Sequence, residues 1–189
     1  MVAQVSLVSL WIPIVLSAVL VFVASSILHM VLTYHRSDFA KLPSEDTVMD
    51  ALGPLSIPPG EYVFPHSSSP AEMKDPAFID KVNKGPVAFM TVMPNGMPKM
   101  GGQLVQWFIY CVIVAIFAAY IATRALGPNP PYLSVFRFVG ATAFIGYSVA
   151  LWQNSIWYKR AWSSTLKSTV DGLVYALLTA GTFGWLWPA

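Results

Sequence analysis

The chain has 189 residues, of which 56% are hydrophobic and only 11% are charged, and its formal net charge is +2. Eight of its nine acids fall within residues 38–80, a pattern typical of a membrane protein with one polar segment rather than of a soluble domain. Because the small positive charge forms no basic patch, nucleic acid is not an expected partner.

Four stretches are apolar enough to be predicted as transmembrane helices, since roughly 20 helical residues cross a hydrocarbon core of about 30 Å. They are residues 7–33, 104–123, 132–152 and 170–187. The first has no Lys or Arg before it and is too long for a secretory signal, so we expect it to be retained as an anchor. The sequence therefore predicts an all-α membrane protein with four transmembrane helices, the first in residues 1–34 and the others in residues 102–189.

Between the first two stretches lies a polar segment, residues 35–101, which contains ten of the fifteen prolines. Two short helices are predicted in it, one with Ser44 as its N-cap and one with Asp75 as its N-cap and Pro76 in the first turn. The stretches "EYVF" and "PVAFMTV" have the composition of short strands. This segment is therefore expected to form a small α+β insertion.

The distribution of Lys and Arg predicts the orientation of the chain in the membrane. Nine of the eleven basic residues lie either between the first and second predicted helices or between the third and fourth, and these two segments share one side of the membrane. Only Arg124 and Arg137 lie on the other side. We therefore expect both termini outside and residues 35–101 in the cytoplasm. The expected location is a bacterial plasma membrane, with membrane lipids around the helices.

Small residues recur at four-residue spacing in the predicted spans, which allows close approach of helices within a membrane. They are Gly172, Ala176, Ala180 and Gly184 in the fourth, Cys111, Ala115 and Ala119 in the second, and Gly146 and Ala150 in the third. These faces could hold the four helices together, or they could dock on other subunits or on a second copy. The first functional hypothesis is therefore a structural or accessory subunit, or assembly partner, of a larger respiratory or transport complex.

A cluster of polar residues on the predicted inner side supplies an alternative function. It comprises His29, Gln153, Asn154 and Asp171. Ionisable residues inside a membrane are costly and often functional, so the cluster could serve transport, proton conduction, or binding of a lipid headgroup or quinone. Structural interpretations stay open, because His29 could simply hydrogen-bond a neighbouring helix and Asp171 is favoured in the first turn of one.

A methionine-rich run gives a second alternative, copper handling, because thioether sulfur is a soft ligand that suits Cu(I). The run contains Met90, Met93, Met97 and Met100, which could equally be flexible apolar filler. Neither His35 nor His66 has the spacing of a metal site. Since no catalytic signature is found, no cofactor or enzymatic activity is predicted.

Overall fold

The computed structural model describes residues 5–188, which divide into two compact units. The first unit consists of residues 5–40 and 99–188, and the second of Lys41–Pro98. Each unit is considered by itself.

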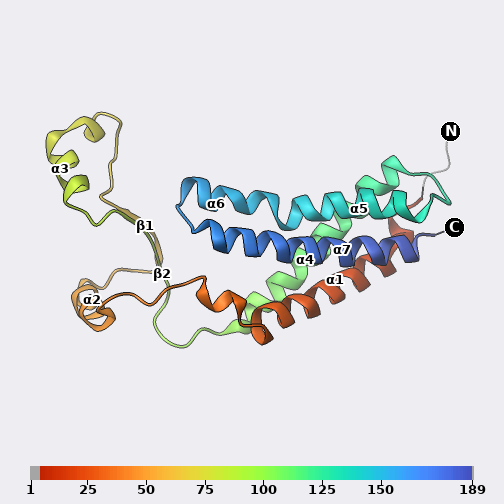
Figure 1. Ribbon diagram of the computed structural model, residues 1–189, viewed down its shortest axis with the longest axis horizontal. Helices are drawn as coiled ribbons and strands as arrows, with labels where there is room; N and C mark the ends of the chain where they lie inside the picture. The colour runs from red at the N-terminus through yellow and green to blue at the C-terminus, as the bar shows by residue number, and fades with distance from the viewer. Residues whose placement is uncertain (1–4, 189) are drawn as a thin grey trace. The chain divides into compact units, whose positions relative to one another are not determined.

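The first unit is a bundle of four long helices (Figure 1). Helices α1 and α5 each pack against both α4 and α7, so the four helices enclose a common interior. The start of α1 and the end of α7 lie at the same end of the bundle, and the short helix α6 lies at the other (Figure 1). The elements are α1 (Trp11–Ser26), α4 (Met100–Ala125), α5 (Tyr132–Tyr147), α6 (Trp152–Trp157) and α7 (Trp162–Leu186).

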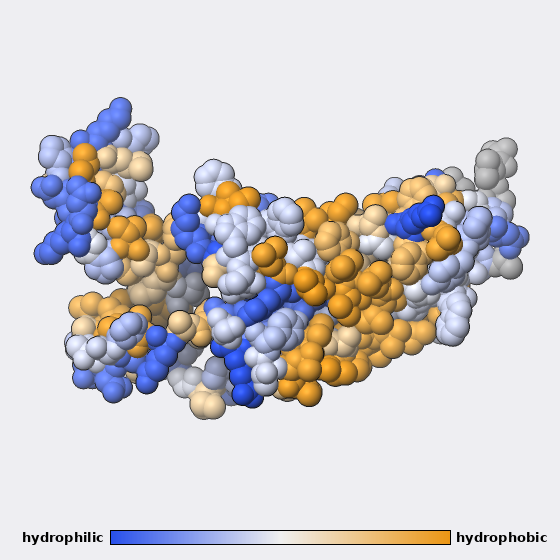
Figure 2. Space-filling view, viewed as in Figure 1, coloured by the Kyte–Doolittle hydropathy of each residue, from blue (hydrophilic) through white to orange (hydrophobic). Residues whose placement is uncertain are grey.

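Three helical segments of this bundle are long and apolar enough to cross a membrane, namely Leu7–Val31, Met100–Ala125 and Tyr132–Trp157. The sequence predicted four. Helix α7 has a similar length, but Asp171 and several threonines and glycines lower its mean hydropathy. Figure 2 shows hydrophobic side chains over much of the visible face of the bundle, as expected for helices surrounded by lipid.

The small residues of the predicted ridges mostly face the interior of this bundle. Ala176, Ala180, Cys111, Ala115 and Ala119 are all buried, whereas Ala150 is exposed. Space is tightest at two glycines of α7, because a Cβ added to Gly172 would collide with Ser148, and one added to Gly184 would meet the ring of Tyr132. At Gly146 an added Cβ would lie 3.2 Å from Val114. The described helices of this chain therefore already occupy most of these faces.

The second unit contains two helices, α2 (Glu45–Leu52) and α3 (Pro76–Lys84), and a two-stranded antiparallel sheet of β1 (Gly60–Phe64) and β2 (Ala88–Val92). Both helices and both strands were predicted from the sequence. Asp75 caps α3 as expected, because its carboxylate accepts a hydrogen bond from the amide of Ala77 at 2.8 Å. Ser44 is the N-cap residue of α2 as expected, but its side chain makes no capping hydrogen bond.

Candidate functional site

A cluster of ionisable side chains lies toward the end of the bundle where α1 ends and α7 begins, around the buried carboxylate of Asp171 in α7. The Nε2 atom of His35 lies 2.8 Å from Asp171 Oδ2, and the hydroxyl of Tyr34 donates a hydrogen bond to Asp171 Oδ1. The Nε2 atom of His29 lies 3.8 Å from the same Oδ2 atom. The imidazole rings of His29 and His35 are stacked, with their centroids 4.3 Å apart.

The path of the backbone after α1 brings these residues to α7. The helix ends in a π-helical turn, Ile27–Val31, which carries His29. Such turns are rare and frequently occur at functional sites. Leu32 is extended, and a 3₁₀ turn, Tyr34–Ser37, then presents Tyr34 and His35 to α7.

A second carboxylate, Asp38, joins this 3₁₀ turn to α7. Its Oδ2 atom lies 2.7 Å from His35 Nδ1, and its Oδ1 atom accepts a hydrogen bond from Lys167 Nζ at 2.9 Å. Lys167 also donates to the carbonyl of Tyr34 at 2.6 Å and to the hydroxyl of Ser37 at 2.8 Å. One lysine of α7 therefore fixes the whole turn in place.

Asp38 is ionised at neutral pH. Burial would raise the pKa of this carboxyl, but the hydrogen bonds from His35 and Lys167 outweigh burial and lower the pKa to about 2. The side chains thus form a continuous polar chain, from His29 through Asp171 and His35 to Asp38 and Lys167.

A cavity of about 530 Å³ opens beside the cluster, lined by α4, α7, the end of α5 and the π-helical turn after α1. His29 and Asp171 contribute polar atoms to its wall, and much of the rest is aromatic. The aromatic rings contact one another, with centroids 5.9 Å apart for Trp107 and Tyr175 and 5.5 Å apart for Tyr147 and Tyr175. A mostly apolar wall with a few polar groups is the usual composition of a small-molecule site, and the volume falls in the usual range.

Two residues of this wall carry polar atoms without a protein partner. The side chains of Tyr147 and Tyr175 are buried, and neither hydroxyl makes a hydrogen bond with any described residue. The neighbouring Trp107 is satisfied, because its Nε1 atom donates to Ser25 Oγ at 2.8 Å. A buried hydroxyl without a partner is costly, and a bound ligand or water would satisfy it.

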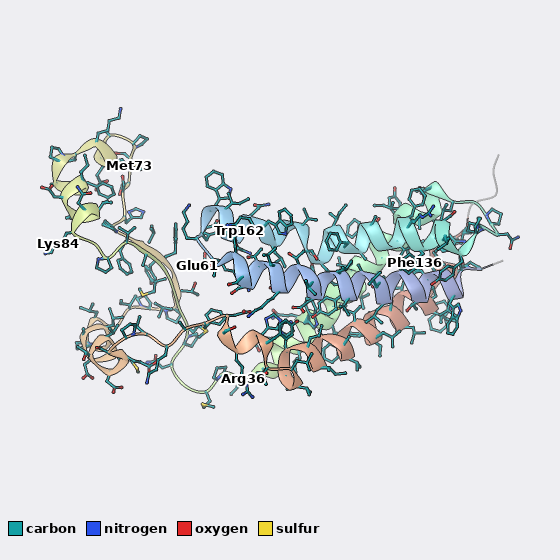
Figure 3. The ribbon with its side chains drawn as sticks, in the orientation of Figure 1. Arg36, Glu61, Met73, Lys84, Phe136 and Trp162 are labelled. Carbon is teal, nitrogen blue, oxygen red and sulfur yellow. The ribbon has the colours of Figure 1, made fainter. Side chains whose placement is uncertain are left out.

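The structure brings together two of the four residues of the predicted polar cluster. His29 and Asp171 meet, whereas Gln153 and Asn154 lie on α6 and do not line the cavity. Helix α6 contacts α7 nearer its start, where Ser155 Oγ lies 2.6 Å from Thr165 Oγ1. The basic residue Arg36 is exposed and points away from the bundle (Figure 3).

Four residues of the site were not identified from the sequence as functional: Tyr34, His35, Asp38 and Lys167. The sequence spacing of two pairs of these charged or ionisable residues is a weak indication that they interact. His35 and Asp38 are three residues apart, and Lys167 and Asp171 are four apart on one face of α7. Both spacings are common on ordinary helices, so neither points to a site without the fold.

The methionine run is spread over a strand and the residues after it. Met90 lies in β2, Met93 and Met97 follow it and are exposed, and Met100 begins α4. Copper binding by this run stays a prediction.

Comparison of the chain with models of known protein families, with curated proteins and with solved structures finds no match, so a function has to be inferred from the geometry of the site.

Proposed function

We propose that this chain is an integral membrane protein that binds a neutral amphiphile of the quinone type, with its ring in the cavity beside His29 and Asp171. The observation that carries the proposal is the cavity, whose wall combines aromatic rings with the polar groups of His29 and Asp171 and with tyrosines whose hydroxyls have no partner among the described residues. A planar ring can stack on Trp107 and Tyr147, and its carbonyl oxygens can accept hydrogen bonds from Tyr175 or His29.

The charges on the cavity wall favour a neutral ring over a phosphate headgroup. Asp171 contributes a carboxylate, and none of the described residues that line the cavity is Lys or Arg. A phosphate group would therefore be placed near a negative charge with no cation to bind it. An isoprenoid tail, by contrast, would find the apolar outer surface of the bundle (Figure 2).

The proposal includes a fourth membrane crossing by α7, with both termini outside and residues 35–101 in the cytoplasm. In its support, α7 packs against both α1 and α5, which are parts of segments that could cross a membrane. Its acid is not presented to lipid, because Asp171 is buried among Tyr34, His35 and His29. Ionisable residues in membrane helices characteristically face the bundle interior in this way.

The accessory-subunit hypothesis has less support from the packing. Its main sequence observation was the ridge from Gly172 to Gly184, and this ridge packs against Ser148, Tyr132 and other residues of the same chain. Docking on another subunit would need a different surface. The hypothesis stays a prediction, and gentle purification from native membranes followed by mass spectrometry would test it.

Binding of decylubiquinone to the full-length protein in detergent micelles tests the quinone proposal. We expect saturable quenching of tryptophan fluorescence beyond that seen with free tryptophan in the same micelles. Replacing Leu151 on the cavity wall with Trp should abolish saturation by filling the cavity. Tyr175→Phe should weaken binding about fivefold, because a hydrogen bond contributes about 1 kcal/mol.

Tyr120→Phe is the matched control, because Tyr120 is exposed on α4 and does not line the cavity. The control variant should bind as the wild type does. Quenching that never saturates, or saturation that Leu151→Trp leaves unchanged, would refute the proposal.

A further inference from the structure

We propose that His29, His35 and Asp171 bind one divalent first-row transition-metal ion. This site goes beyond the quinone proposal and does not depend on it, because it rests on side chains of the polar cluster and not on the aromatic wall. Each of the three residues offers one ligand atom, and these atoms all lie within 4.8 Å of one another.

The ligand atoms need only small movements to reach metal-ligand geometry. Zinc is bound by imidazole nitrogen and carboxylate oxygen at about 2.0–2.2 Å, which places neighbouring ligand atoms roughly 3–3.5 Å apart. His35 Nε2 and Asp171 Oδ2 are 2.8 Å apart, and His29 Nε2 is 3.8 Å from that oxygen. Because the side chain of His29 is 49% exposed, it has room to make the remaining movement.

The groups behind the ligands are those that a metal site requires. A histidine that binds a metal through one ring nitrogen usually donates its other N–H to a carboxylate, which fixes the ring and raises its basicity. His35 has this arrangement, with Asp38 at 2.7 Å from Nδ1 while Nε2 faces Asp171. Tyr34 in turn occupies Asp171 Oδ1 and leaves Oδ2 to face the two histidines.

These supporting groups are themselves fixed. Asp38 is held by Lys167, which also donates to the backbone of Tyr34. A hydrogen bond between His35 Nε2 and Asp171 Oδ2 requires one proton, which a metal ion bound by both atoms would displace. The ring of His35 is therefore already oriented for a bound ion, and His29 is the ligand that would have to move.

The donor set indicates the class of ion. Two imidazoles and one carboxylate suit Zn²⁺, Fe²⁺, Mn²⁺ or Co²⁺, whereas Ca²⁺ and Mg²⁺ prefer all-oxygen sites. Three protein ligands leave at least one coordination position open. His29 and Asp171 both line the 530 Å³ cavity, so an open position could be reached from it.

Metal analysis of the purified full-length protein tests this proposal without any quinone. The protein in detergent would be stripped with a chelator, loaded with Zn²⁺ or Co²⁺, dialysed and analysed by mass spectrometry. We expect one ion per chain and, with Co²⁺, visible absorption bands of an ordered site. His35→Ala and Asp171→Asn should lose both the ion and the bands.

Two further variants keep the test decisive. His29→Gln changes a half-exposed ligand and so should leave the folded bundle intact, yet it should weaken Zn²⁺ binding at least tenfold in competition with a chelating dye. Asp38→Asn keeps all three ligands and should weaken binding roughly 10- to 100-fold, as loss of a carboxylate behind a histidine ligand does.

His66→Ala is the matched control, because His66 is exposed and lies in the second unit. It should bind one ion as tightly as the wild type. Absence of a stoichiometric ion from folded wild-type protein would overturn the proposal, as would equal binding by His29→Gln and wild type. The quinone measurement is separate, so failure of either proposal would be recognised without affecting the other.

Discussion

Asp38 and His35 are joined by a 2.7 Å contact between Oδ2 and Nδ1 within a single turn of the chain, while the other edge of the same imidazole faces Asp171. His35 therefore lies between two carboxylates that come from different helical segments. This arrangement couples the turn after α1 to α7, and it makes the stability of the bundle depend on the charge of Asp38.

The pH dependence of this coupling can be derived from the pKa of Asp38. Because the folded-state pKa is lowered from 3.8 to about 2, the stabilisation is fully present well above pH 4 and is lost as the pH falls through about 2. We expect Asp38→Asn to lower the free energy of unfolding by about 1–3 kcal/mol at pH 7, since hydrogen bonds to a charged group are lost. Below about pH 2 the two proteins should approach equal stability.

Thermal unfolding in detergent between pH 7 and pH 2 measures this difference. The matched control is Asp46→Asn, because Asp46 is an exposed acid in the second unit. A difference between wild type and Asp38→Asn that stayed constant down to pH 2 would contradict an ionised Asp38.

Lys167 should control the order of the turn between His35 and Asp38. Its ammonium group donates to Tyr34, Ser37 and Asp38, so Lys167→Met removes three hydrogen bonds at once. We expect faster amide hydrogen exchange in residues 33–38, together with a loss of about 1–3 kcal/mol of stability. Lys159→Met is the control, since Lys159 is exposed and does not contact the turn; equal exchange in the two variants would show that Lys167 does not hold it.

Two residues of this site, Asp171 and His29, could be identified from the sequence. Asp171 and His29 stand out because ionisable residues are rare in long apolar stretches, and their burial has to be compensated. Gln153 and Asn154 directly follow the third predicted transmembrane helix, so the sequence places them at the same side of the membrane as His29 and Asp171. They are displaced from the site because a 3₁₀ turn, Val149–Leu151, and the short helix α6 follow α5.

His35 and Asp38 could not be identified in this way, because they follow the first apolar stretch and read as the start of the polar segment. The turn that returns them to α7 depends on hydrogen bonds to Lys167, about 130 residues away in sequence. A contact between residues so far apart in the sequence produces no local sequence pattern from which it could be predicted. By contrast, α3 was predictable, since Asp75, Pro76 and Gly85 mark its ends within ten residues of one another.

A side chain at Gly172 should destabilise the bundle, because its Cβ would collide with Ser148 where α7 crosses the end of α5. We expect Gly172→Ala to lower the free energy of unfolding by about 1–3 kcal/mol, the usual cost of overfilling a packed interior. Adding Ser148→Ala should recover part of that loss. The control is Gly102→Ala in α4, where an added Cβ meets nothing within 4 Å.

Thermal unfolding of the four variants in the same detergent measures the coupling between these positions. Gly102→Ala should be neutral or slightly stabilising, since alanine favours a helix over glycine by up to about 1 kcal/mol. Additive effects of Gly172→Ala and Ser148→Ala would mean that the two residues are not in contact.

The proposed orientation predicts opposite labelling of two introduced cysteines. The natural Cys111 is fully buried, so a membrane-impermeant maleimide should not modify the wild-type protein. Pro128→Cys, in the exposed link between α4 and α5, should react in intact cells. Ser68→Cys, exposed in the second unit, should react only after the membrane is permeabilised. Labelling of Ser68→Cys but not Pro128→Cys in intact cells would show that the orientation is the opposite of the proposed one. The site of His29 and Asp171 would then lie near the outer surface of the membrane.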